Sequence, residues 1–208
     1  VLTRIKNIKK IVTWCPENNK LLIINNQEIL LEDGTIKQIK EEVSGAEIEI
    51  DAFGALLTPS FIDSHTHPIF FGNRSNEFSR RICGESYEMI AKMGGGIVSS
   101  INDVRNSSEE ELFNYCMNHV KFFIKHGTTT IEAKSGYGLS LEDELKSLRV
   151  IKRLNNESQL DLVPTFMGAH DFPKEFDSKH DYYIDLICNE MIPAVAEENL
   201  AEYCDVFC

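Results

Sequence analysis

The sequence lacks any stretch near the ~20 consecutive apolar residues that a membrane-spanning helix needs, so we expect no membrane partner. It is also poor in basic residues, because 21 Lys and Arg stand against 33 Asp and Glu, which gives a formal net charge of −12. An excess of acid repels nucleic acid, and we expect no nucleic-acid partner. Residues 1–6 lack the apolar core of a signal peptide, so the expected location is cytoplasmic.

No C-x-x-C pair occurs among the six cysteines. Four of them lie in stretches that we interpret as helix or strand interiors. This pattern predicts reduced, buried thiols in a reducing compartment and argues against a disulfide framework. The 208 residues suit one full domain, or one domain with a small appendage.

Two histidines follow an apolar run at residues 57–62, and one residue separates them. In a β-strand, side chains at i and i+2 point to the same face, so His65 and His67 can aim two imidazoles at one point. Neutral imidazole is a ligand for zinc and several other divalent metals. The spacing therefore predicts a metal site, whereas the structural alternative is two exposed histidines in a turn.

Residues 1–55 consist of short β-prone runs separated by turns. Glu32, Asp33 and Gly34 form a good hairpin turn between two such runs. Residues 47–51 alternate polar and apolar side chains, as a half-exposed strand does. We expect a small antiparallel β-layer here, too small to be stable by itself.

From residue 56 onwards the pattern changes to alternating strands and helices. We expect strands at 55–62, 128–133 and 160–166, with a fourth beginning at 205. We expect helices at 86–93, 106–126, 142–155 and 182–198, the last kinked or broken at Pro193. Strands that alternate with helices indicate parallel β/α units. A barrel is favoured, and an open doubly wound sheet is the alternative.

Three polar clusters come directly after successive expected strands: His65 with His67, residues 134–137, and His170. The carboxyl ends of parallel strands share one rim, so these clusters are expected to converge there. A closed (β/α)₈ barrel needs ~250 residues. The residues after Leu56 suffice for three β/α units and the start of a fourth, and we therefore expect the first half of a larger protein.

Several longer motifs occur in a distinctive order. They are Pro59-Ser60-Phe61-Ile62-Asp63-Ser64-His65-Thr66-His67, Phe71-Gly72-Asn73-Arg74, His126-Gly127-Thr128-Thr129-Thr130, Lys134-Ser135-Gly136-Tyr137-Gly138-Leu139, Pro164-Thr165-Phe166-Met167-Gly168-Ala169-His170 and Asp205-Val206-Phe207-Cys208. Together they resemble the amidohydrolase superfamily and, within it, the imidazolonepropionase family, over essentially the whole chain. Ser60 departs from the glycine that this superfamily usually carries after the proline.

The resemblance implies an α/β fold built on a metal-dependent (β/α)₈ TIM-like barrel. Residues 56–208 would supply its first three to four β/α units, the N-terminal half of the barrel. Residues 1–55 would form a small N-terminal β domain, part of a β-sandwich that the superfamily builds from both chain ends.

The resemblance also implies roles for individual residues. His65 and His67 would bind one divalent metal ion, zinc or iron. Arg74 would grip the substrate carboxylate, since a guanidinium binds a carboxylate through two hydrogen bonds. Tyr87 and Tyr137 would donate hydroxyl groups at the same end. His170 would contact the imidazolone ring or its carbonyl.

The implied reaction is metal-dependent hydrolysis of the cyclic amide of 4-imidazolone-5-propanoate, a small anionic substrate, to N-formimino-L-glutamate in histidine degradation. The alternatives are another amidohydrolase, namely a deaminase or a cyclic-ureide hydrolase, and a non-catalytic truncated homologue that acts as a binding or assembly module. The remaining metal ligands and the catalytic acid–base group of the superfamily belong to later strands, beyond Cys208, so this chain alone would lack the full site. Exposed sheet edges would favour pairing with another chain, and a homodimer is one expected assembly.

Lys134 permits two interpretations. In binuclear relatives a lysine at a strand end is carboxylated and bridges two metals, but the most similar family is mononuclear. We therefore favour a structural ion pair for Lys134. No role is assigned to His119, His126 or His180.

Overall fold

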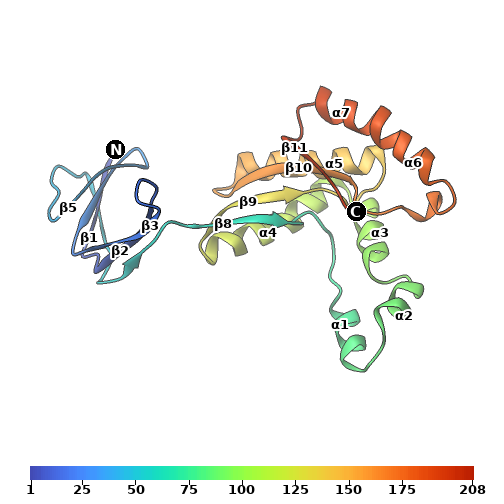
Figure 1. The fold of residues 1–208 in the computed structure, drawn as a ribbon, viewed down its shortest axis with the longest axis horizontal. Helices are drawn as coiled ribbons and strands as arrows, with labels where there is room; N and C mark the ends of the chain where they lie inside the picture. The colour runs from blue at the N-terminus through green and yellow to red at the C-terminus, as the bar shows by residue number, and fades with distance from the viewer. The chain divides into compact units, whose positions relative to one another are not determined.

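The chain forms two units, Val1–Ser60 and Phe61–Cys208, in a computed structural model (Figure 1). The structure describes residues 1–208 except the side chain of Ala91. From the sequence we divided the chain at residue 55. The difference arises at Leu56–Leu57, which form a short strand β7 in the first unit and do not begin the following strand.

The first unit contains two small sheets. One has the order β5-β4-β1-β6, and the other has the order β3-β2-β7. Their strands are β1 (Leu2–Lys6), β2 (Lys10–Cys15), β3 (Lys20–Asn25), β4 (Glu28–Glu32), β5 (Thr35–Lys40) and β6 (Ile48–Asp51). The pairs β1–β6 and β2–β7 are parallel and the others are antiparallel. The prediction of one antiparallel layer was therefore wrong, because the later strands β6 and β7 return beside the first two in parallel.

The second unit is built on one parallel sheet. Its strands are β8 (Phe61–Thr66), β9 (Thr128–Lys134), β10 (Asp161–Ala169) and β11 (Tyr203–Val206), in the order β11-β10-β9-β8. Consecutive strands are neighbours, so every crossover advances in the same direction. A doubly wound sheet instead reverses direction at a switch point. Among these strands there is no reversal, and the winding is that of a barrel.

Helices cover one face of this sheet (Figure 1). They are α4 (Glu109–Lys125), α5 (Leu141–Glu157), α6 (His180–Leu186) and α7 (Ile192–Glu197). The helical spacing of Leu145, Leu148 and Ile151 predicts an apolar stripe on α5, and all three residues are buried in the main core. Ile131 and Phe166 enter that core from the sheet. The helices and the alternating strand residues thus form a single apolar layer on one side, which leaves the other face of the sheet polar.

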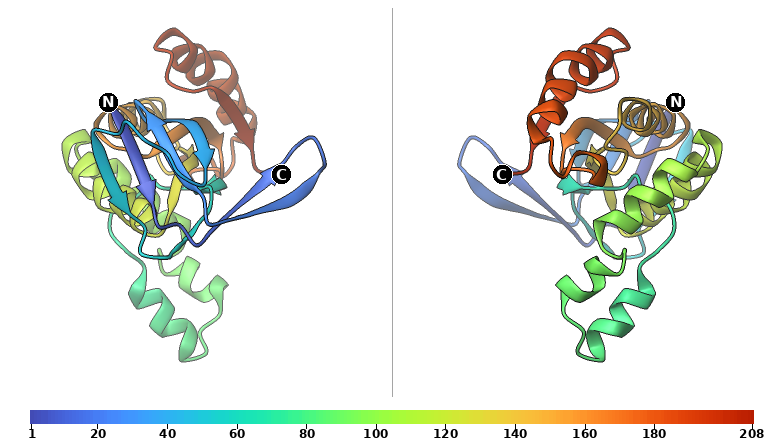
Figure 2. Two further views of the ribbon diagram at one scale, coloured as in Figure 1. Left: turned by 90° about the vertical axis from the view of Figure 1, so that its left-hand side faces the viewer. Right: turned by 90° about the vertical axis from the view of Figure 1, so that its right-hand side faces the viewer.

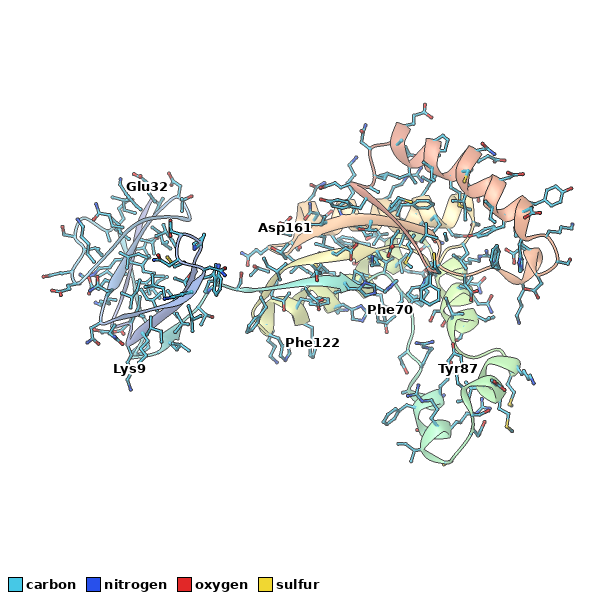
Figure 3. All side chains as sticks on the ribbon, viewed as in Figure 1. Lys9, Glu32, Phe70, Tyr87, Phe122 and Asp161 are labelled. Atoms are coloured by element: carbon cyan, nitrogen blue, oxygen red, sulfur yellow. The ribbon has the colours of Figure 1, made fainter. Side chains whose placement is uncertain are left out.

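Three further helices lie between β8 and α4: α1 (Ser75–Ile82), α2 (Tyr87–Lys92) and α3 (Ile97–Asn106). Only α2 was predicted. In α1 the only apolar residues are Phe78 and Ile82, which are too few to reveal a helix, and none of its residues is buried. In α3, Ile97, Ile101 and Val104 follow helical spacing, which was a usable signal. Figures 2 and 3 show α1 and α2 as a pair that projects from the sheet and carries Tyr87.

The irregularity expected near Pro193 takes the form of a π-helical turn, Ile187–Met191, between α6 and α7. Proline has no N–H group to donate within a helix, so a local change of hydrogen-bonding pattern is expected beside it. In the part of the chain that the structure describes, no helix is long and apolar enough to cross a membrane.

The cysteines are free thiols, as their spacing predicted, but most are not buried. Cys116 lies in the core of the second unit, whereas Cys83, Cys188, Cys204 and Cys208 are exposed. Four of the six thiols were expected to be buried, and this was wrong, because only Cys116 is buried and the exposed thiols lie in or beside short elements or near residue 208.

The sequence predicts a cap at the start of α4, because Ser108 is followed three residues later by Glu111. The Ser108 hydroxyl accepts a hydrogen bond from the Glu111 N–H, and the Glu111 carboxylate accepts one from the Ser108 N–H at 2.9 Å. This reciprocal pair is a capping box, which satisfies two donors that the helix itself leaves unpaired. The cap fixes where the helix that covers β9 begins.

Replacing Ser108 by alanine removes this cap. We expect Ser108→Ala to lower the free energy of unfolding by about 1 kcal/mol, measured by urea denaturation. Ser108→Thr is the matched control, since it keeps the hydroxyl and should stay near wild type. Equal midpoints for the two variants would contradict a capping role.

Candidate active site

The face of the sheet opposite the helices carries a buried ion-pair network. The Lys134 ammonium, only 3% exposed, donates to Glu132 Oε1 at 2.8 Å and to Asp205 Oδ2 at 2.7 Å. The Thr165 hydroxyl donates to the same Glu132 oxygen at 2.9 Å. Burial alone lowers the pKa of a lysine, but the hydrogen bonds to Asp205 and Glu132 outweigh it and raise the pKa of Lys134. Lys134 is therefore a charged ion-pair partner, as the favoured interpretation predicted.

His65 and His67 lie at the end of β8, beside this network. Their ring centres are 5.5 Å apart, with the ring planes inclined by 70°. The Lys134 hydrogen bond, with a smaller contribution from nearby His65, lowers the pKa of Asp205. Zinc–nitrogen bonds are about 2.0–2.1 Å, so two imidazoles on one ion have ring centres about 5 Å apart. The pair thus has a spacing that fits a shared metal ion.

His67 has the protonation state that a metal ligand needs. Burial, helped by the charges of His170, His65 and Lys134, lowers the pKa of His67 to about 4, although a backbone hydrogen bond with Ser135 opposes the shift. At neutral pH the imidazole is consequently uncharged. Its Nδ1 atom is buried and, among the described residues, has no hydrogen-bond partner. An orphaned ring nitrogen next to a second histidine fits an absent ligand or metal.

Tyr137 and His170 surround the His67 ring. His170 stacks on His67 with ring centres 4.7 Å apart, and Tyr137 lies 5.7 Å from His67 and 5.3 Å from His170. These residues follow β8, β9 and β10, so the expected convergence at the carboxyl ends is observed. His170 Nδ1 lies 2.8 Å from the Gly136 carbonyl oxygen. Because a carbonyl only accepts, Nδ1 carries a proton in this contact, and in the neutral form of the ring Nε2 is then the unprotonated nitrogen.

Arg74 shares a pocket of about 260 Å³ with His67 and Tyr137. Burial raises the pKa of the Tyr137 hydroxyl, and the nearby Arg74 charge opposes that rise. Tyr137 is therefore a neutral hydroxyl donor at physiological pH, within the electrostatic reach of a guanidinium. Asn73, Ser100 and Asp103 are the other polar lining residues, and sequence reasoning did not identify Ser100 and Asp103.

Tyr87 is not part of this group of side chains. It does not line the Arg74 pocket, and its side chain is 58% exposed on α2. A Cβ atom on Gly96 would lie 3.2 Å from its hydroxyl oxygen, so Tyr87 sits against the turn before α3. Its influence on Tyr137 is a weak electrostatic contribution that raises the Tyr137 pKa.

A complete set of metal ligands is not assembled by these residues. Apart from the undescribed side chain of Ala91, the chain has no group of three or more His, Cys, Asp or Glu side chains placed to hold a metal ion. His65 and His67 can therefore supply two ligands, while a tetrahedral centre needs further ligands.

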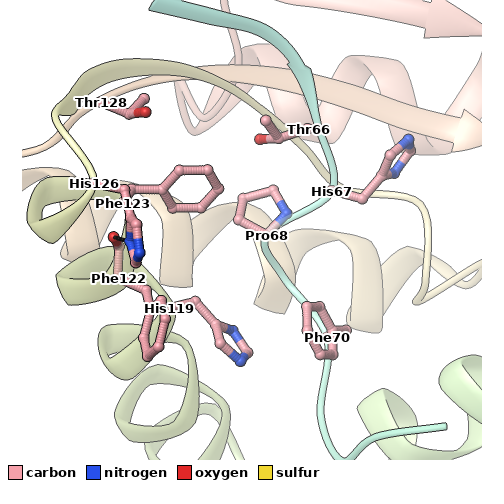
Figure 4. A pocket seen from close by; sticks show the side chains of 9 residues that line it. All are labelled: Thr66, His67, Pro68, Phe70, His119, Phe122, Phe123, His126 and Thr128. Atoms are coloured by element: carbon pink, nitrogen blue, oxygen red, sulfur yellow. Dashed lines mark hydrogen bonds between the residues drawn. The ribbon is translucent and has the colours of Figure 1, made fainter. Parts of the chain in front are cut away.

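A second, larger pocket of about 460 Å³ lies between α4 and the segment after β8 (Figure 4). It is mainly apolar, and its aromatic lining includes Phe122, Phe123 and Phe70, which stacks on His119 with ring centres 4.5 Å apart. In Figure 4 the imidazole of His67 points away from these side chains. His67 borders both pockets, whereas Arg74, Tyr137 and His170 do not line the larger one.

Sequence reasoning also missed Glu144, which is completely buried under the loop that carries Tyr137. A signal was present, because Glu144 precedes Leu148 by four residues and Ile151 by seven and so falls on the buried stripe of α5. A carboxylate at an apolar position of a helix is seldom buried unless it has partners.

Comparison with known proteins gives strong sequence matches, although no family model matches the chain. An imidazolonepropionase of Thermoanaerobacter pseudethanolicus is 45% identical over 98% of this chain and 51% of its own length. One from Solibacter usitatus is 46% identical over 93% of this chain and 48% of its own length. The chain therefore spans about half the length of the curated relatives it matches.

Solved structures agree on the fold. Guanine deaminase from C. acetobutylicum superimposes with a TM-score of 0.56 at 14% identity, over 99% of this chain and 46% of that one. N-isopropylammelide isopropylaminohydrolase from Burkholderia multivorans gives a TM-score of 0.57 at 15% identity, over 98% of this chain and 44% of that one. Over nearly its whole length the chain is therefore similar to imidazolonepropionases, and it corresponds to about half the length of those relatives.

Proposed function

We propose that this chain supplies part of the active site of an imidazolonepropionase, which hydrolyses 4-imidazolone-5-propanoate to N-formimino-L-glutamate in histidine degradation. The observation that carries this proposal is the convergence of Arg74, Tyr137 and His67 on one pocket, with His170 stacked on His67. The 45% identity to an imidazolonepropionase supports the choice of substrate.

Each residue has a chemical role in this proposal. The Arg74 guanidinium binds the propionate tail, and the Tyr137 hydroxyl donates to the same end of the substrate. Tyr87 would join them if the substrate draws α2 closer. His170 offers the unprotonated Nε2 atom to an N–H group of the imidazolone ring, because Gly136 keeps Nδ1 protonated. These contacts orient the ring, whose carbonyl–nitrogen bond is broken by water.

His65 and His67 would hold one divalent metal ion, zinc or iron. When bound, such an ion supplies hydroxide at neutral pH by lowering the pKa of a coordinated water from about 15.7 towards 7. The further ligands and the general acid–base group would come from parts of the protein outside residues 1–208. Two observations support this proposal. Among the described residues, no group of three or more ligand side chains is placed to hold a metal ion, and the chain spans only about half the length of its relatives.

The proposal extends to architecture and assembly. Residues 56–208 would form the first three to four units of a (β/α)₈ barrel, and residues 1–55 would form the N-terminal part of a composite β-sandwich. The sequential parallel order of β8 to β11 supports the barrel. We propose a cytoplasmic enzyme, and a homodimer is the assembly to test first by light scattering.

Removal of the metal tests the catalytic proposal. In the full-length protein, thorough chelation should abolish hydrolysis of imidazolone propionate. His67→Ala should weaken metal binding more than roughly 100-fold, because loss of a residue that only hydrogen-bonds to a metal ligand already costs roughly 10–100-fold. Metal content measured by mass spectrometry, together with turnover, checks both. His126→Ala is the matched control and should retain metal. Undiminished turnover after complete metal removal would exclude this mechanism.

Arg74 tests the substrate. We expect Arg74→Ala to raise KM for imidazolone propionate by about 10- to 100-fold, since a hydrogen bond to a charged group contributes about 1.5–3 kcal/mol. A neutral ring substrate should be affected much less. Arg81→Ala, at an exposed position of α1, the helix that follows Arg74, is the control and should leave KM unchanged. An equal effect on charged and neutral substrates would instead favour a deaminase or another amidohydrolase.

A further inference from the structure

Glu144 is a buried ionisable residue for which the proposed reaction has no direct use. Its two carboxylate oxygens accept from the Gly136 N–H at 3.1 and 3.2 Å, and one of them accepts from the Gly138 N–H at 2.8 Å and the Leu139 N–H at 2.9 Å. The Ser135 hydroxyl also bonds to it. The carboxylate therefore gathers the main chain of residues 135–139, which we call the Tyr137 loop.

The Tyr137 loop is held tightly against α5. A Cβ atom on Gly138 would lie 2.5 Å from the Asp143 carbonyl carbon and 2.7 Å from the Glu144 nitrogen, so only glycine permits this approach. From the other side, the Arg105 guanidinium donates to the Gly138 carbonyl at 2.7 Å and the Leu139 carbonyl at 2.9 Å. Three main-chain donors of the loop are thus satisfied by Glu144, and two of its acceptors are satisfied by Arg105.

Glu144 holds the main chain on both sides of the Gly136 carbonyl, through the Gly136 N–H and the Gly138 N–H. Gly136 has a φ angle of +107°, and its N–H group points to Glu144. Its carbonyl then accepts from His170 Nδ1 at 2.8 Å. The same residue therefore links the buried carboxylate to a ring that stacks on His67.

We propose that Glu144 is a positioning residue of the proposed active site, which sets the orientation of Tyr137 and, through the Gly136 carbonyl, the Nδ1–H tautomer of His170. This inference rests on the function proposed above, because it gives Tyr137 and His170 their roles. Glu144 itself touches no substrate; it acts through the Tyr137 loop.

A carboxylate suits this position better than an amide. Three backbone N–H groups and one hydroxyl converge on Glu144, and an ionised carboxylate has about four acceptor sites and no donor. Glutamine would turn an NH₂ group towards at least one of these donors. Burial raises the pKa of Glu144, and the hydrogen bonds from Ser135, Leu139, Gly138 and Gly136 act in the opposite direction.

The first experiment measures the His170 tautomer directly, by ¹⁵N NMR of the histidine-labelled chain. The His170 signal is assigned from its absence in His170→Gln. Wild type should show Nδ1 protonated, and Glu144→Gln should lose that preference and gain the Nε2–H form. Glu142→Gln, an exposed position of the same helix, is the matched control and should match wild type.

Ser108→Ala separates positioning from simple loss of stability, because it should destabilise the fold without altering His170. If Glu144→Gln does not fold, Glu144→Asp replaces it: the shorter carboxylate reaches fewer N–H groups and should give a partial loss of the Nδ1–H form. A folded variant at position 144 with an unchanged His170 tautomer would overturn the inference.

The second experiment measures turnover in the full-length protein. Glu144→Gln should reduce kcat/KM for imidazolone propionate by about 10–100-fold, a loss typical of outer residues that orient a site, with metal content unchanged. Retention of wild-type kcat/KM would contradict the inference. If the unaltered enzyme fails to hydrolyse this substrate, the proposed function is wrong, while the NMR result still decides whether Glu144 sets His170.

Discussion

The buried ammonium of Lys134, held between the carboxylates of Glu132 and Asp205, is the interaction on which the polar face of the sheet depends. It joins β9 to β11 across β10, and Thr165 of β10 shares the Glu132 oxygen. Leaving one such charge buried without its partner would cost about 3–5 kcal/mol. The network therefore favours one register of the three strands, and the loops after β9 and β10 begin from fixed points beside His67.

Much of the second unit could be predicted from the sequence because its signals are local. The serine and glutamate at the start of α4 mark a cap, and the spacing of Leu145, Leu148 and Ile151 marks a buried helix face. The i, i+2 spacing of His65 and His67 requires only a strand. Parallel strand ends share a rim, so the approach of His170 to His67 followed from topology alone.

The rest depends on contacts between residues far apart in sequence, which local patterns do not reveal. The parallel partners of β1 and β2 return only after long connections, so the two sheets of the first unit were read as one antiparallel layer. Asp205 meets Lys134 across 71 residues. The role of Glu144 depends on the path of a loop whose turns are set by glycines. The resemblance indicated which residues matter, and only coordinates relate them to their supports.

The acceptor that orients His170 is a main-chain carbonyl, and every residue type has one. Codon changes at position 136 cannot delete this acceptor; they act only by distorting the peptide, and a Cβ there would come within 2.9 Å of His170 Nδ1. Selection should consequently remove substitutions at Gly136 and Gly138, the two glycines that flank Tyr137. Natural substitutions that change the chemistry of this loop should then occur at its side chains, while the path of its main chain stays the same.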